Sequence, residues 1–377
     1  MPRTPEPVLG SLRLRQWALG VLSSAEPPPA PPPASPAAWA LFLRVEQCAL
    51  PLAARYSEDA PIPSPLLRDR ARSDSRRVLA ARMQLRRLGA LARDRGLRLA
   101  ALKGGAALLC GGPELPMMDV DVMASPEGAR SLADALDAAG HRVHGRAAAH
   151  RLAVRATEGE LPVEIHTAAP GIPAGAVDRA VAVPGAPLLV LHPADHLHYL
   201  VVHSVVQHED RRGRIRDLVL VADALGRCAP EDLRRVHEAV AREPQAAALA
   251  GQIAQARALG ERRGPAPDPF ELMAAGRFLL AHRLDRWKLK NTAREFAWTA
   301  GCAAVAARSG SHQVGGTVSL DLPSAHRSLA WIRRRTPAAE RAVRLLARRG
   351  KDWLLRPLGA AVAAGTERAL RERAAEG

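Results

Sequence analysis

The stretch of residues 97–121 constrains the fold of this chain more than any other feature. It begins with an apolar run, residues 97–102, whose length is that of a buried strand. The run ends at Lys103-Gly104-Gly105, where glycine permits backbone angles and close approaches that a side chain would forbid. Residues 106–110 then have the pattern of the first turns of a helix. A strand, a glycine turn and a helix N-terminus together form a site where backbone N–H groups can face a phosphate.

Two aspartates follow this predicted helix in the pattern Asp119-Val120-Asp121-Val122. Residues two apart on a strand point to the same face, so Asp119 and Asp121 share one face while the two valines are buried on the other. Two carboxylates held side by side repel each other unless a cation lies between them. Hard oxygen ligands of this kind suit Mg²⁺, so the pair predicts a magnesium site.

A second acidic strand is predicted within residues 161–167. Val163 and Ile165 can face the core, which leaves Glu164 and His166 on the opposite face, as with the two aspartates. A third carboxylate from a neighbouring strand would complete a metal site for phosphoryl or nucleotidyl transfer. Two ions in such a site activate the attacking oxygen and stabilise the leaving one.

Three short motifs in this order resemble a known family. They are Leu102-Lys103-Gly104, Asp119-Val120-Asp121 and Glu164-Ile165-His166. Together they are similar to the uncharacterised bacterial nucleotidyltransferases of the polymerase-β-like superfamily, and a weaker likeness extends over residues 39–225. The resemblance implies an α+β fold, in which a small mixed β-sheet forms the nucleotidyltransferase core and helical regions flank it on both sides. Where the superfamily often has Gly-Ser, this chain has Gly104-Gly105.

The resemblance also implies an activity and a set of site residues. The expected reaction is Mg²⁺-dependent transfer of a nucleoside monophosphate from a nucleoside triphosphate such as ATP. The acceptor is a hydroxyl of a small molecule, a peptide or a protein, and pyrophosphate is released. Asp119, Asp121 and Glu164 are the expected catalytic residues and ligands of a two-ion site, with Glu164 alternatively the base for the acceptor hydroxyl. The expected nucleotide-binding residues are Lys103, Gly104, Gly105, His166, Arg214 and Asp217.

Arg214 and Asp217 have two interpretations of equal weight. Family members have a basic-x-x-Asp pattern at the corresponding place, so the two side chains would close over the nucleotide. The alternative is a helix N-terminus with an acidic residue in its first turn, which favours the helix dipole. Under either interpretation the sequence predicts a helix from about residue 214 to residue 225.

Two other functions remain open, and the net charge of +16 bears on the first of them. A toxin-like nucleotidyltransferase acting on tRNA would use the predicted basic helix of residues 66–95, which has ten arginines, and the basic tail of residues 331–377. Aromatic residues make up only 3% of the chain, so bases would have few stacking platforms. GC-rich coding explains the arginine excess more simply, and an RNA partner is therefore not favoured. The third hypothesis is an inactive nucleotide-binding protein of the same fold.

The remaining residue types indicate no second chemistry. His192, His196, His198, His203 and His208 cluster in the sequence, but without a His-Glu-x-x-His pattern we interpret them as pocket-lining or partly exposed rather than as metal ligands. The four cysteines form no Cys-x-x-Cys pair, which favours reduced, mostly buried thiols. We find no signal peptide and no run of 18 apolar residues, so we expect a cytoplasmic protein without a membrane span.

Composition and chain breaks predict five segments. Ala and Leu favour helix, so most of the chain is expected to be helical. The segments are a Pro-rich N-terminal extension (1–36), an N-terminal helical region (37–95), the α/β core (96–185), a helical domain (186–308) and a basic C-terminal helical tail (309–377). Within them we predict helices over residues 8–22, 39–56, 66–95 and 127–139, a strand around residues 150–156, and a return to helix from residue 188.

Overall fold

The computed structural model describes residues 4–57, 61–146, 151–155, 161–207, 212–243, 245–262, 264 and 268–282. The chain divides into two compact units, of which the first comprises Met1–Phe278 with Gly365–Gly377 and the second Leu279–Ala364. Nearly all described residues belong to the first unit, and the fold below is that of this unit. The predicted basic tail lies outside the described residues, as do His208 and Cys302.

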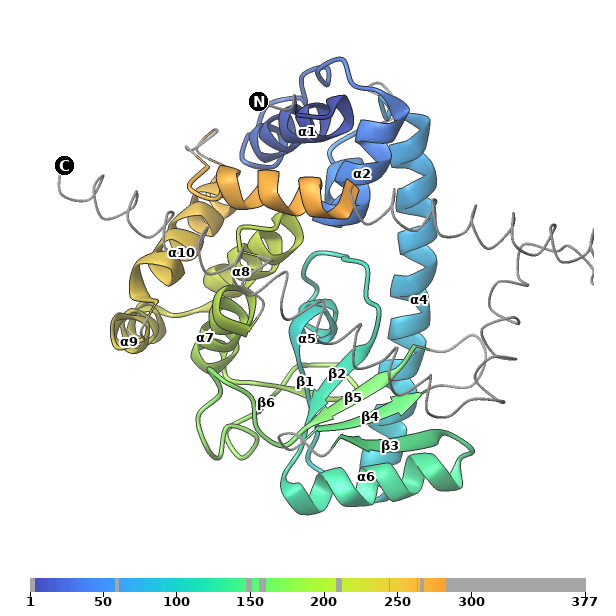
Figure 1. Ribbon diagram of the computed structural model, residues 1–377. Helices are drawn as coiled ribbons and strands as arrows, with labels where there is room; N and C mark the ends of the chain where they lie inside the picture. Colours follow the sequence, from blue (N-terminus) through green and yellow to red (C-terminus); the bar gives the residue numbers. More distant parts are fainter. Residues whose placement is uncertain are drawn as a thin grey trace, which may run out of the picture. The chain divides into compact units, whose positions relative to one another are not determined.

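A mixed β-sheet of seven strands carries the predicted motifs (Figure 1). Its spatial order is β3-β4-β5-β2-β1-β7-β6. Two neighbouring pairs, β2 with β5 and β1 with β7, are parallel, and the other four pairs are antiparallel. The strands are β1 (Ala100–Ala101), β2 (Val120–Met123), β3 (Arg142–Arg146), β4 (Arg151–Arg155), β5 (Val163–His166), β6 (Val181–Ala182) and β7 (Leu189–Val190). The predicted α+β class with a small mixed sheet is confirmed.

Three strands of this sheet are not predicted from the sequence, namely β3, β6 and β7. The predicted return to helix at residue 188 is wrong, because Leu189–Val190 pairs in parallel with Ala100–Ala101 and the next helix begins at Pro193. The apolar run Leu188-Leu189-Val190-Leu191 fits helix and buried strand equally, so pairing with β1 decides its structure. The sheet therefore continues beyond residue 185.

Helices make up most of the rest of the described chain. They are α1 (Glu6–Leu22), α2 (Pro36–Glu46), α3 (Ala49–Ala53), α4 (Pro65–Asp94), α5 (Lys103–Leu109), α6 (Pro126–Ala138), α7 (Pro193–Val202), a π-helical turn (His203–Gln207), α8 (Ile215–Arg227), α9 (Pro230–Ala241) and α10 (Ala246–Gly260). Residues 271–282 are also helical. The single helix predicted over residues 39–56 is wrong, because Gln47 has a left-handed backbone (φ 51°) and ends α2. The other predicted helices are confirmed within three residues at each end.

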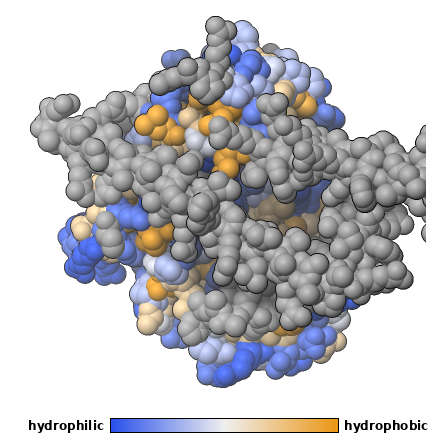
Figure 2. All heavy atoms as spheres, viewed as in Figure 1, coloured by the Kyte–Doolittle hydropathy of each residue, from blue (hydrophilic) through white to orange (hydrophobic). Residues whose placement is uncertain are grey.

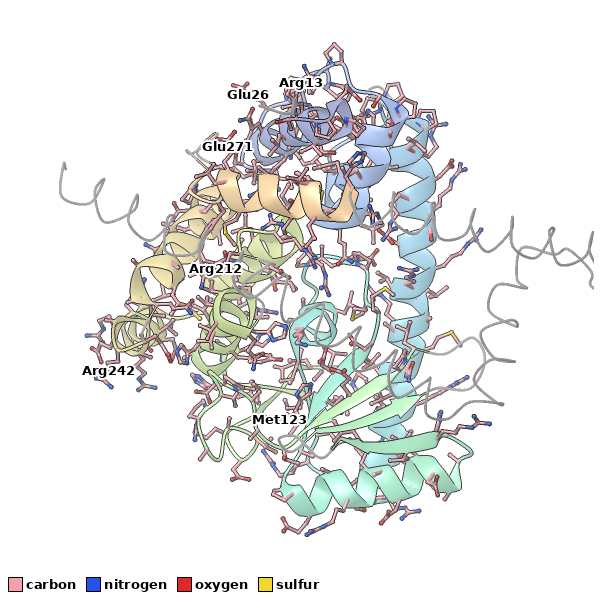
Figure 3. All side chains as sticks on the ribbon, viewed as in Figure 1. Arg13, Glu26, Met123, Arg212, Arg242 and Glu271 are labelled. Carbon is pink, nitrogen blue, oxygen red and sulfur yellow. The ribbon has the colours of Figure 1, made fainter. Side chains whose placement is uncertain are left out.

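The two faces of the sheet differ in character. Val120, Val122, Val163 and Ile165 point to one face, where they form an apolar core with side chains of α4 and α6, among them Leu85, Leu88 and Leu132. The outer side of α6 is hydrophilic (Figure 2). The strand alternation leaves the acidic side chains of β2 and β5 on the opposite face. There, Met123 at the end of β2 packs with Leu102 and with Tyr199 of α7 (Figure 3).

The N-terminal helix is an integral part of the first unit. A Cβ atom added at Gly10 of α1 would lie 2.6 Å from the Cβ of Ala38 in α2, so the two helices are in close contact there. The Pro-rich segment between them has neither helix nor strand, and Trp17 Nε1 donates a hydrogen bond to Pro29 O at 3.0 Å. None of the described helices has both the length and the apolar composition needed to cross a bilayer.

Candidate active site

The pairing of β2 with β5 brings three predicted site residues together. The two strands are parallel, with Asp121 opposite Glu164 and Met123 opposite His166. The His166 Nε2 atom lies 2.9 Å from Asp121 Oδ1 and 3.9 Å from Glu164 Oε2. Each residue offers one potential ligand atom, and these three atoms lie within 4.8 Å of one another. In the part of the chain that the structure describes, this is the one such group of His, Cys, Asp or Glu residues. We call these three residues the acid cluster.

Lys103 joins the acid cluster from the start of α5. Its Nζ lies 2.8 Å from Asp121 Oδ1, and its side chain is 13% exposed. Lys103 also has a left-handed backbone (φ 48°), a conformation that costs free energy in any residue other than glycine and is concentrated at functional sites. The strained backbone therefore belongs to Lys103, whose ammonium group contacts Asp121 of the acid cluster.

The two glycines after Lys103 do not form the predicted glycine turn. Both lie in the first turn of α5 and have no positive φ, so this expectation is wrong. Gly104 does permit a close approach, the other effect expected of glycine here, because an added Cβ would lie 3.0 Å from Met117 Sδ. An added Cβ at Gly105 would make only ordinary contacts, the nearest at 3.6 Å.

Asp121 is the electrostatic centre of the site. The residue is 5% exposed, and burial alone would raise its pKa. The Lys103 ammonium and the hydrogen bond from His166 more than offset that effect and hold the pKa of Asp121 well below its usual range. Asp121 is consequently ionised at neutral pH, and both partners approach the same oxygen.

Asp119 lies beside the acid cluster but is not one of its three members. It precedes β2 and is partly buried. Burial and the negative charge of Asp121 raise the pKa of Asp119, and Lys103 opposes them. The predicted role of Asp119 as a metal ligand stays a prediction, and so do the predicted roles of the other site residues.

The start of α8 brings a residue that sequence analysis missed. Arg216 is close enough to Asp119 to lower the pKa of that carboxyl. Its Nε atom is buried and has no hydrogen-bond partner among the described residues, and its Nη1 lies 4.0 Å from Asp217 Oδ1. Arg214 instead acts on Glu46, whose pKa it helps to lower. The motif Arg214-Ile215-Arg216 offers two arginines, and only the path of α8 shows which of them reaches Asp119.

Asp217 lies in the first turn of α8, with Arg214 at the N-cap position. This arrangement matches the structural interpretation of the pair, and it leaves the nucleotide-binding interpretation untested. A contribution of Asp217 to the helix dipole and a contact with a ligand are compatible, since its side chain remains 13% exposed.

The clustered histidines of α7 have separate environments. His196 is 3% exposed, and burial together with Arg227 lowers its pKa to about 3, so it is neutral. His192 and His198 line a cavity of about 450 Å³ next to Gly171 and α9, as predicted for pocket-lining histidines. His203 contacts Gln207 within the π-helical turn.

The acid cluster has a donor set that fits a divalent cation. Two carboxylates supply hard oxygen atoms, and a neutral imidazole is a common additional ligand. Lys103 already places a positive charge 2.8 Å from Asp121 Oδ1, so a metal ion would displace the ammonium from this oxygen or bind beside it through the remaining carboxylate oxygens. The residues that would hold the metal are Asp121 and Glu164, with His166 beside them.

Comparison with known proteins gives one match that covers most of the chain. A family model described as an uncharacterised nucleotidyltransferase matches residues 39–258, more than half of the sequence. Among curated proteins, no significant match to this chain was found.

Solved structures show more distant likenesses. The solution structure of the antibiotic-resistance factor ANT(2'')-Ia is 16% identical, with 44% of this chain and 91% of that chain covered and a TM-score of 0.34. A tRNA nucleotidyltransferase complexed with a primer tRNA and an incoming ATP analogue is 17% identical, with 47% and 62% covered and a TM-score of 0.21. The present chain thus spans about three fifths of that second protein's length.

Proposed function

This chain belongs to the family of uncharacterised nucleotidyltransferases, and we propose that it is a metal-dependent enzyme whose active site is the acid cluster. The proposed reaction transfers a nucleoside monophosphate from a nucleoside triphosphate to an acceptor hydroxyl, with release of pyrophosphate. The observation that carries the proposal is the convergence of Asp121, Glu164 and His166 within 4.8 Å on one face of the sheet. The Lys103 ammonium adds a phosphate-binding cation at the same place.

The acidic residues have distinct proposed roles. Asp121 and Glu164, with Asp119 beside them, would hold Mg²⁺, and Asp121 is ready to do so because it is ionised at neutral pH. A divalent cation bound there supplies charge neutralisation at the phosphates and activates the attacking hydroxyl. Glu164 alternatively accepts the proton of the acceptor hydroxyl, as its side chain is 14% exposed on the site face.

The basic residues would hold the nucleotide phosphates. Lys103 would exchange part of its contact with Asp121 for a phosphate oxygen, since its ammonium has three donors. The N–H groups of Gly104 and Gly105 are at the start of α5, where backbone donors have no acceptor within the helix. We place His166 beside the phosphates and assign Arg216 to the pyrophosphate that leaves, while Arg214 and Asp217 would close over the nucleotide, as the family resemblance implies.

We propose a small molecule, a peptide or a protein as the acceptor in preference to tRNA. Several arginines of the basic helix α4 already have acidic partners, as Arg70 does with Asp74 at 3.0 Å and Arg82 with Glu114 at 2.8 Å. Aromatic residues, on which nucleic-acid bases stack, make up 3% of the chain. An arginine-covered, solvated helix accounts for the same residues without an RNA partner.

Label transfer from α-labelled nucleotides tests the proposal. Purified protein is incubated with Mg²⁺ and each α-labelled nucleoside triphosphate, separately with no addition, with bulk tRNA and with a metabolite extract. We expect label on a small molecule or on protein, and no label when Mg²⁺ is chelated. Label on tRNA alone would replace the proposed acceptor by RNA. Nucleotide binding without transfer to any acceptor would indicate an inactive nucleotide-binding protein.

A further inference from the structure

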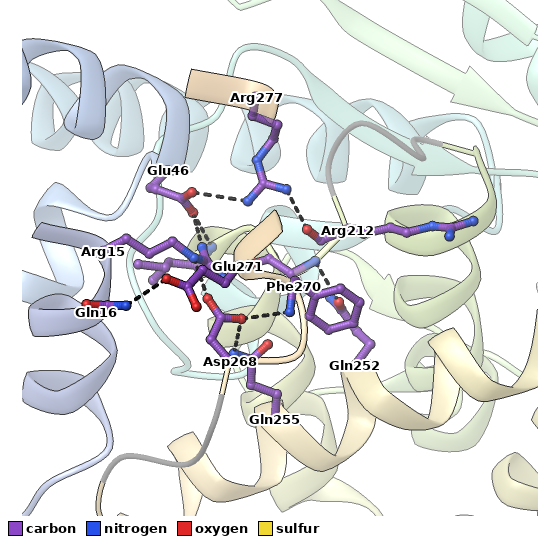
Figure 4. Close-up of polar contacts among 12 residues, drawn as sticks. Arg15, Gln16, Glu46, Arg212, Gln252, Gln255, Asp268, Phe270, Glu271 and Arg277 are labelled. Atoms are coloured by element: carbon purple, nitrogen blue, oxygen red, sulfur yellow. Dashed lines mark hydrogen bonds and ion pairs between the residues drawn. The ribbon is translucent and has the colours of Figure 1, made fainter. Parts of the chain in front are cut away.

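A cluster of four buried charges lies at the start of α8 (Figure 4). It consists of Arg15, Glu46, Asp268 and Arg277, whose side chains are 1%, 0%, 7% and 6% exposed. We call it the buried charge cluster. Arg15 lies 2.9 Å from Glu46 and 2.7 Å from Asp268, and Arg277 lies 3.2 Å from Glu46. Two positive and two negative charges therefore cancel inside the protein.

The buried charge cluster also binds the backbone that leads into α8. Arg277 Nη1 donates to Arg212 O at 2.5 Å, and Arg15 Nη2 donates to Gly213 O at 2.7 Å. Glu46 Oε2 accepts from the Ile215 N–H at 2.7 Å. In addition, the Gly213 N–H donates to Gln252 Oε1 of α10 at 2.9 Å. Side chains from four separate segments thus fix the path of residues 212–215.

Steric contacts allow this segment little freedom. Gly213 has a positive φ of 63°, and a Cβ added there would lie 2.4 Å from the Cβ of Phe270. Phe270 is itself held, because its N–H donates to Asp268 Oδ1 at 3.0 Å. The same aspartate that pairs with Arg15 therefore holds the ring that packs on Gly213.

Residues 212–215 lead directly into α8, so their fixed path sets the position of Arg216. Arg216 is in the first turn of α8 and interacts electrostatically with Asp119. α8 contacts α5, and a Cβ added at Gly112 would lie 2.6 Å from Asp223 Oδ1, so α8 also packs on the connection from α5 to β2. A small rotation of α8 at residues 212–215 would move the Arg216 guanidinium away from Asp119, which lies beside the acid cluster.

Stability alone does not explain four buried charges. Replacing a buried ion pair by apolar side chains of similar volume is often neutral or stabilising. What apolar side chains cannot supply is directional hydrogen bonding. Arg15 donates through three different nitrogen atoms, to the carboxylates of Asp268 and Glu46 and to the backbone oxygen of Gly213. Arg15, Asp268 and Arg277 lie outside the residues that match the family, so this chain's flanking segments provide part of the contacts, and Glu46 and Gln252 provide the others from within the matched residues.

We propose that Arg15 and Glu46 are positioning residues, which fix the start of α8 so that Arg216 faces Asp119, beside the acid cluster, and binds the polyphosphate of the substrate. This inference rests on the proposed nucleotidyl transfer. It assigns to the N-terminal helices α1 and α2 a role in substrate binding, although none of their residues belongs to the acid cluster.

A double-mutant cycle tests the proposal. Binding of inorganic tripolyphosphate in the presence of Mg²⁺ is measured by calorimetry for the full-length protein and for the variants Glu46→Gln, Arg216→Gln and the double variant. We expect each single substitution to weaken binding on the order of tenfold, and the double variant to bind no more weakly than Arg216→Gln alone. Arg15→Lys, which keeps the charge but loses the planar fork, should behave as Glu46→Gln does and replaces it if that variant does not fold.

A matched control separates positioning from general destabilisation. Leu132→Ala removes a fully buried side chain of α6, away from α8, and should lower the melting temperature without changing tripolyphosphate affinity. Additive losses in the cycle, or an equal loss of affinity in Leu132→Ala, would overturn the positioning role while leaving the proposed function standing. Absence of binding of both tripolyphosphate and nucleoside triphosphates by the wild-type protein would overturn both.

Discussion

At the scale of single residues, Asp121 differs from Asp119 in what surrounds it. Lys103 and His166 both contact the same carboxylate oxygen of Asp121, whereas burial and the charge of Asp121 raise the pKa of Asp119. Removing one carboxylate therefore relieves repulsion in one case and isolates a buried cation in the other. Similar chemistry in two neighbouring residues thus leads to opposite consequences for stability.

We predict that Asp119→Asn and Asp121→Asn both abolish nucleotidyl transfer but affect stability differently. Asp121→Asn leaves the Lys103 ammonium, 13% exposed, without its anion and should lower the free energy of unfolding by about 2–4 kcal/mol. Asp119→Asn should leave the free energy of unfolding unchanged or slightly higher. Transfer assays and urea unfolding of both variants check this. Normal transfer in either variant would remove that aspartate from the catalytic site.

We predict that the buried imidazole of His196 makes the protein less stable in acid. Its pKa is near 6.5 in an unfolded chain and about 3 in the folded protein, because burial disfavours the charged form. Between these values the unfolded state binds the additional proton, so stability falls as pH decreases from 6.5 towards 3. From pH 7 to pH 5 the contribution is about 2 kcal/mol. Urea unfolding at several pH values should show this decrease in unfolding free energy between pH 7 and pH 5 in the wild type and not in His196→Leu. The same pH dependence in both proteins would contradict the role of His196.

At the scale of elements, the entry into α8 depends on one glycine. Gly213→Ala would place a Cβ 2.4 Å from Phe270 at a positive φ of 63°, so we predict a loss of at least about 2 kcal/mol in unfolding free energy. Gly226→Ala is the matched control, since Gly226 lies within α8, the helix that Gly213 precedes, with no atom within 4 Å of an added Cβ. It should be neutral or stabilising by up to about 1 kcal/mol. Thermal unfolding of both variants measures the contrast, and equal effects would be inconsistent with this description of the turn.

The sequence predicts those elements whose patterns are local. The alternation of Asp119-Val120-Asp121 and of Val163–His166 gives both the strands and the face that carries the acids. Ser125 and Pro126 give the start of α6, where the Ser125 hydroxyl accepts from the Gly128 N–H. These features depend on neighbours in the sequence, which is why they are readable without a structure.

Features that depend on distant contacts are not readable in this way. The two-residue strands β6 and β7 exist because they pair with each other and β7 with β1, and their own sequence has no distinctive pattern. The left-handed conformation belongs to Lys103 and not to the glycines that follow it. The role of Arg216 depends on the direction of α8, which residues far away in the chain determine.

At the scale of the whole molecule, the net charge of +16 raises the question of an RNA partner. We predict that tRNA binding is weak, blind to sequence and lost by ~150 mM salt, at which surface charges are screened beyond ~8 Å. Filter binding at several salt concentrations measures this. Replacing the exposed Arg68, Arg72 and Arg76 of α4 by Gln would leave activity on a small acceptor intact. Tight binding that persists above ~150 mM salt, with a slope reduced by these substitutions, would instead support a tRNA-directed enzyme.

We propose that the acid cluster performs nucleotidyl transfer. The most direct measurement compares α-labelled and γ-labelled nucleoside triphosphate in parallel reactions, with wild-type protein and with Asp121→Asn, using the acceptor found in the label-transfer screen. We predict that the wild-type protein transfers the α label to the acceptor and releases the γ label in pyrophosphate. We also predict that both products disappear in Asp121→Asn and on chelation of Mg²⁺. Release of the γ label as inorganic phosphate, or undiminished transfer by Asp121→Asn, would contradict the proposal.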